Sequence, residues 1–137
     1  MAALTLAVER LAAATVLSCH GVLVAASAMQ LETALSQALL RPELRIVVDL
    51  AAVAAIDCTG VMMLRVTAGI AAEQGGALVL AGPNAQVVHT LRECGSLGAI
   101  ATYSTVQAAL DADTTALITA PDTVPATTAW PINRRSA

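Results

Sequence analysis

Short apolar runs alternate with apolar residues at helical spacing along most of the chain, which predicts a domain of mixed strands and helices. Leu4, Leu6 and Val8 alternate with small or polar residues, and the apolar run 16–24 then has the character of a buried strand. These first two runs are typical of an antiparallel hairpin at the edge of a sheet.

From there to about residue 110, predicted strands and predicted helices alternate along the chain. The first helix is expected over 28–40, begun by a capping box from Ser27 to Gln30 and stopped by Pro42. The residues 51–56 look like a connection between a strand and the second helix. Gly95 suits the left-handed end of the third helix, and a second capping box at 104–107 begins the last one. The remaining expected elements are strand 46–50, helix 61–74, strand 77–81, a helix after Asn84, and strand 100–103.

Strands that alternate with helices need crossover connections, and these connections place the strands parallel to one another. The pattern therefore predicts an α/β fold with a mixed, mostly parallel sheet of about five strands, an N-terminal antiparallel hairpin and about four helices. The domain is expected to span residues 1–112. Residues 113–137 are dominated by Thr, Ala and Pro without apolar periodicity, so they are predicted to form a flexible tail.

Composition narrows the function classes. The chain has 137 residues, a net charge of −3 and no basic cluster longer than Arg134-Arg135, and this argues against nucleic acid as the main partner. Its three cysteines and two histidines have no metal-type spacing, so no metal site and no cofactor are expected.

No enzyme motif stands out. A phosphatase loop would place an arginine six positions after Cys58, where Leu64 stands, and no glycine-rich dinucleotide motif follows the first strand. We therefore expect a protein that is not an enzyme.

The uncharged stretch from Leu11 to Leu31 has the length of a membrane span. Polar residues are spread through all of it, and Glu9 offsets Arg10, the only positive charge ahead of it. The favoured interpretation is a cytoplasmic domain without a membrane partner.

Residues 46–60 carry the most specific signal. An apolar strand ends in Asp49-Leu50, a short link follows, and Asp57-Cys-Thr-Gly60 makes a turn into a helix. In this pattern, and in Gly21, 75–80, 91–97 and 103–110, the chain resembles the STAS domains, and among them the bacterial anti-sigma factor antagonists. The resemblance covers roughly residues 3–112.

The resemblance implies a STAS-like fold and a regulatory role. The unmodified domain would bind an anti-sigma factor that is also a serine kinase of the histidine-kinase-like ATPase type, and so free a sigma factor. Phosphorylation of the first serine in the turn would break this contact, because a phosphate adds about −1.5 to −2 charges. In this chain Cys58 occupies that position, Thr59 is the remaining hydroxyl, and Val24 stands where the family often has Asp.

Three interpretations of Cys58 stay open. It can be a small structural residue at a tight helix start. The domain can bind its partner constitutively or switch through Thr59. Cys58 can also act as a thiol switch, with Cys94 as a candidate disulfide partner, because a helix N-terminus favours the thiolate although Asp57 opposes it.

The helix 61–74 is apolar nearly all round, which gives a separate argument for a partner. One face suits the sheet, and the other would meet either the helix 28–40 or a second protein. The expected docking surface consists of Asp57, Cys58, Thr59, Gly60, Met62, Met63 and Val66. A homodimer is a further candidate assembly. Two other functions remain open: a thiol redox sensor using Cys58 and Cys94, and a STAS regulatory module of a membrane transporter.

Overall fold

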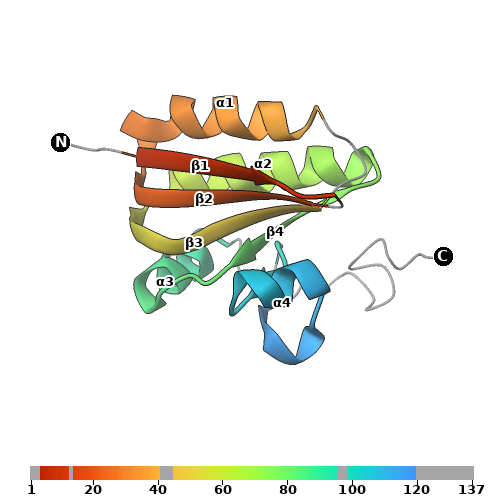
Figure 1. Cartoon of the computed structure of the whole chain (residues 1–137). Coiled ribbons are helices and arrows are strands. Elements are labelled where there is room, and N and C mark those ends of the chain that lie inside the picture. The colour runs from red at the N-terminus through yellow and green to blue at the C-terminus, as the bar shows by residue number, and fades with distance from the viewer. Residues whose placement is uncertain (1–3, 13, 41–44, 96–98, 120–137) are drawn as a thin grey trace.

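The computed structural model describes residues 4–12, 14–40, 45–95 and 99–119, and within these ranges it forms one sheet with helices on both faces (Figure 1). The strands are β1 (Leu4–Arg10), β2 (Ala14–Leu23), β3 (Arg45–Ile56), β4 (Ala77–Ala81), β5 (Thr102–Tyr103) and β6 (Leu117–Thr119). The helices are α1 (Ala28–Ala38), α2 (Cys58–Glu73), α3 (Ala85–Glu93) and α4 (Val106–Asp111), with short 3-10 turns at Ala25–Ser27 and Thr114–Ala116.

The six strands lie in the sheet in chain order. The β1–β2 hairpin is antiparallel, and β2, β3, β4 and β5 are parallel neighbours, which confirms the predicted mixed, mostly parallel sheet. The sheet has six strands instead of about five, because β6 pairs antiparallel with β5. Its apolar run is only Ala116-Leu-Ile118, too short to stand out in the sequence.

The described domain therefore extends to Thr119, beyond the predicted boundary at residue 112. The rest of the predicted tail, 120–137, lies outside the described residues.

Two core clusters lie on opposite faces of the sheet. On one face α1 and α2 lie side by side, as Figure 1 shows, and their buried residues join those of α3 around Ile46, Val48 and Leu80. On the other face α4 covers Val47, Val79 and their neighbours through Ala108 and Ala109. Strands buried on both faces explain why the central runs are continuously apolar.

Strand β3 is longer than the sequence pattern predicted. Residues 51–56, expected as a connection, continue the strand and pair with the second half of β2. Only Arg45–Asp49 pairs with β4, so the last part of β3 extends beyond that neighbour. Helix α3 packs against β3, and the Asn84 side chain ties the start of α3 to this extension by donating to the Val53 carbonyl at 3.0 Å.

The predicted capping boxes are wrong in detail. The Ser27 hydroxyl makes no cap bond to α1 and instead donates to the Val22 carbonyl at 2.8 Å, which holds the loop after β2. At α4 the capping side chain is Thr105, one residue later than expected, and it accepts from the Ala108 N–H at 3.0 Å. At α1 the loop backbone offers Ser27 another partner, and at α4 the cap moves because the helix begins at Val106.

The uncharged stretch 11–31 is part of the folded domain. Its described residues form β2, the 3-10 turn and the first part of α1, where tertiary contacts bury most of the large apolar side chains, among them Val16, Leu17, Leu23 and Leu31. Among the residues that the structure describes, no helix is both long and apolar enough to cross a membrane.

Helix α2 begins against the end of β2 at a position that has no room for a side chain. A Cβ atom at Gly60 would lie 2.5 Å from the Leu23 carbonyl oxygen and 3.2 Å from the Ile56 side chain. Glycine is therefore required here for close approach, while its backbone stays helical.

We expect Gly60→Ala to lower the free energy of unfolding by about 1–3 kcal/mol, since the added methyl group must displace backbone. Gly69→Ala on the same helix is the matched control, because a Cβ atom at that position would have no neighbour within 4 Å. The control should raise stability by about 0.5–1 kcal/mol, as alanine favours the helix. Urea denaturation measures both, and equal effects of the two substitutions would contradict this explanation of Gly60.

Candidate functional site

The candidate site lies where β2 and β3 end side by side. Because the two strands are parallel, Leu23 and Ile56 pair at the same edge of the sheet, and the segments that follow them are neighbours. The first of these segments is the 3-10 turn Ala25–Ser27, and the second is Asp57 with the start of α2. This is the edge of the sheet where ligands and partners of parallel α/β folds usually bind.

Asp57 joins these segments. Its side chain caps α2 by accepting from the Gly60 N–H at 3.0 Å through Oδ1. Its second oxygen, Oδ2, accepts from the Ala25 N–H at 3.2 Å, and its own N–H donates to the Leu23 carbonyl at 3.1 Å. Asp57 therefore fixes the first turn of α2 to the loop after β2.

The first turn of α2 presents its side chains in two directions. Gly60 and Val61 are buried against β2 and the core, whereas Cys58, Thr59 and Met62 are exposed. The predicted docking surface included Gly60 together with the three exposed residues. The structure brings all four onto one turn, but Gly60 faces the sheet and only the other three point outward.

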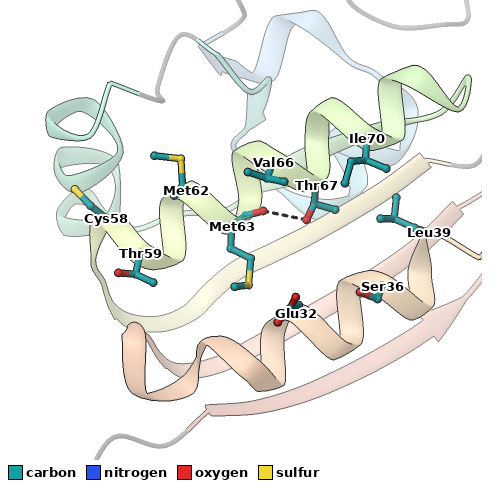
Figure 2. A pocket seen from close by; sticks show the side chains of 10 residues that line it. All are labelled: Glu32, Ser36, Leu39, Cys58, Thr59, Met62, Met63, Val66, Thr67 and Ile70. Carbon is teal, nitrogen blue, oxygen red and sulfur yellow. Dashed lines mark hydrogen bonds between the residues drawn. The ribbon is translucent and has the colours of Figure 1, made fainter.

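A groove continues from this turn along α2. Figure 2 shows its two walls, α1 and α2, with Met63 on α2 directed toward Glu32 on α1. It encloses about 590 Å³ and has mostly apolar walls. Its lining residues are Glu32 and Ser36 from α1, Leu39 at the C-terminal cap of α1, and Cys58, Thr59, Met62, Met63, Val66, Thr67 and Ile70 from α2.

Helix α1 covers only part of the second face of α2. Met63 is half-buried and packs on the core, but Met62, Val66 and Ile70 remain 53%, 56% and 38% exposed. The helix 28–40 therefore covers this face only in part, and the expectation of a second protein on the rest of it stays a prediction. The Thr67 hydroxyl is satisfied within α2, since it donates to the Met63 carbonyl at 2.9 Å. This leaves apolar side chains and the Thr59 hydroxyl on the open side.

The lining residues from α1 were not among the candidates from the sequence. Glu32, Ser36 and Leu39 recur at helical spacing, yet this spacing alone does not show that their face borders a groove. Their position follows from the packing of α1 beside α2, which no local pattern reveals.

Cys58 and Cys94 are brought together and form a disulfide. Cys58 is the first residue of α2 and Cys94 ends α3, and their Cα atoms are 5.7 Å apart, within the usual range for such a bond. Cys58 is exposed and Cys94 is half-buried. Val24, the other departure from the family pattern, lies between β2 and the 3-10 turn, one residue before the N–H that Asp57 accepts from.

Cys19 differs from this pair. It is buried in the core, where burial first and the nearby charge of Asp49 second raise the pKa of its thiol to about 12. Within the described part of the chain, no cluster of three or more His, Cys, Asp or Glu residues could hold a metal ion.

Comparison with known structures shows the same fold in several proteins. An anti-sigma factor antagonist from Mycobacterium paratuberculosis is 23% identical, with a TM-score of 0.73 over 80% of this chain and 93% of its own. The anti-sigma factor antagonist SpoIIAA in its unphosphorylated form is 17% identical, with a TM-score of 0.67 over 79% of this chain and 95% of its own.

A similar domain also occurs inside a much larger protein. The murine Slc26a9 anion transporter is 13% identical, with a TM-score of 0.66 over 78% of this chain but only 18% of the transporter. None of the curated proteins is similar enough in sequence to match this chain. The model of the STAS domain family matches residues 5–109, which take in β1 from its second residue, β2 to β5, all of α1, α2 and α3, and the Asp57–Gly60 turn. This chain therefore belongs to the STAS domain family.

Proposed function

We propose that the protein is an anti-sigma factor antagonist of the bacterial cytoplasm, which works by binding and not by catalysis. Its partner would be an anti-sigma factor of the histidine-kinase-like ATPase type, whose capture frees a sigma factor. The observation that carries this proposal is the open apolar groove that begins at Thr59 and Met62, on the turn that the family resemblance assigns to docking.

The groove has the features of a protein-binding surface. Exposed apolar residues that adjoin one another mark interaction sites more often than isolated ones do, and here three of them follow one side of α2. Methionine side chains adapt to a partner because they are flexible and polarisable. Glu32 and Ser36 on the opposite wall provide polar groups at the edge of the apolar strip, an arrangement found in many interfaces.

Thr59 is the hydroxyl through which a kinase partner would control this surface. It is exposed, stands second in α2 and lines the groove. A phosphate there would be held by the positive end of the helix dipole. It would also place about −1.5 to −2 charges at the mouth of an apolar groove, which disfavours docking.

Of the other candidate functions, a transporter regulatory module rests on the likeness to the murine transporter, and that likeness shows the fold alone. The alternative of a thiol redox sensor rests on the Cys58–Cys94 disulfide. Light scattering of the free protein will show whether a homodimer competes for the same groove.

Met62→Glu should weaken binding of the purified cognate anti-sigma factor at least about tenfold, because a charge must then be buried in an apolar contact. Stability should change little, since the side chain is half-exposed. Val8→Glu is the matched control: Val8 is 48% exposed on β1 and does not line the groove. Calorimetry of both variants, in the same thiol state as the unchanged protein, measures the affinities. Normal binding by Met62→Glu would rule out the groove as the docking surface.

Incubation with the same kinase and ATP should add one phosphate, and Thr59→Val should abolish the addition. Thr33→Val, which removes an exposed threonine on α1, should leave it unchanged. Intact-mass analysis and peptide mapping identify the site. A Thr59→Val protein that still gains phosphate would place the modification elsewhere.

A further inference from the structure

Two sulfur atoms from separate elements meet beside the proposed docking surface. Cys58 begins α2 and Cys94 ends α3, 36 residues apart in sequence, and the structure joins them in a disulfide with their Cα atoms 5.7 Å apart. Thr59 follows Cys58 directly, and Met62 lies one helical turn further on. A bond at this position therefore acts on the residues that open the groove.

This bond is within reach of small thiols. Cys58 is exposed and Cys94 is half-buried, so a thiol in solution can approach the pair without unfolding the domain. Cys19 is sealed in the core, and its raised pKa keeps it protonated at neutral pH. Exchange should therefore be confined to Cys58 and Cys94.

The start of α2 also favours chemistry at Cys58. Free N–H groups in the first turn and the helix dipole stabilise a thiolate at this end. The Asp57 carboxylate opposes this effect, but its two oxygens already accept hydrogen bonds from Gly60 and Ala25. With Cys94 adjacent as the resolving thiol, Cys58 has both parts that reversible disulfide formation requires.

We propose that Cys58 and Cys94 form a reversible thiol switch that sets the affinity of the docking surface, the disulfide form binding the partner more tightly. This inference rests on the proposed function and adds its regulation. To close the switch, the Cys58 thiolate attacks a small disulfide such as oxidised glutathione, forming a mixed disulfide and releasing one thiolate. The Cys94 thiolate then attacks Cys58 Sγ and releases the second, so the protein loses two electrons and two protons while the small disulfide gains them. A dithiol reverses the reaction.

The disulfide should favour docking because it orders the surface in advance. It ties the first turn of α2, with Thr59 and Met62, to the end of α3, so binding costs less conformational entropy. Reduction frees this turn on the α3 side. It also leaves a free thiol at the place where the resemblance puts the family's phosphate, and a thiolate formed there adds negative charge that opposes docking.

A titration with reduced and oxidised glutathione tests the chemistry on the full chain. Intact mass with thiol alkylation should show one intramolecular disulfide under oxidising conditions and three free thiols under reducing ones. Cys19→Ala should behave like the unchanged protein, whereas Cys94→Ser should instead retain a glutathione adduct on Cys58. Three free thiols throughout, or a bond that survives dithiothreitol in the folded protein, would overturn the switch.

Calorimetry with the purified anti-sigma factor then tests the consequence. The oxidised protein and oxidised Cys19→Ala should bind at least about threefold more tightly than the reduced protein. Cys94→Ser kept in a dithiol should match the reduced form. Equal affinity of the oxidised and reduced proteins would overturn the regulation and leave the proposed function intact. Absence of binding in both states would overturn both, even if the glutathione titration behaves as expected.

Discussion

The packing of the first turn of α2 against the end of β2 is the contact on which the rest of the site depends. Gly60 approaches the Leu23 carbonyl so closely that a Cβ atom would lie 2.5 Å from it. Asp57 holds the same junction by accepting from the N–H groups of Gly60 and Ala25. The close backbone contact and the two hydrogen bonds of Asp57 together fix the direction in which α2 leaves the sheet. This direction decides which side chains of α2 face outward.

The length of β3 explains how the third helix reaches this junction. Strand β3 continues to Ile56 while its pairing with β4 ends at Asp49, and α3 contacts β3. Asn84 anchors the start of α3 to Val53 and also caps the helix through the Val87 N–H. If β3 had ended near Leu50, as its first apolar run suggested, the Val53 carbonyl would not be in place to hold the start of α3, the helix that ends at Cys94 beside Cys58.

Helix α2 has more apolar surface than the domain can cover. Val61, Leu64 and Ala71 bury against the sheet, and α1 covers Met63. The remaining apolar side chains, Met62, Val66 and Ile70, stay exposed and so contribute little hydrophobic stabilisation to the isolated domain. The two sides of α2 therefore differ: the sheet-facing side stabilises the domain, and the open side is the one that we propose for recognition.

The amino-acid sequence by itself determined the alternation of strands and helices, the parallel sheet with its hairpin, and the Asp57–Gly60 turn, because these follow from periodicity and local hydrogen bonding. It missed β6, the second half of β3 and the true partners of Ser27, since short strands and polar side chains are governed by neighbours far along the chain. It named Cys58, Cys94 and the outer side of α2 as candidates. Only the tertiary structure decided that the two sulfurs meet and that Glu32, Ser36 and Leu39 form the second wall of the groove, because distances between helices depend on how whole elements pack.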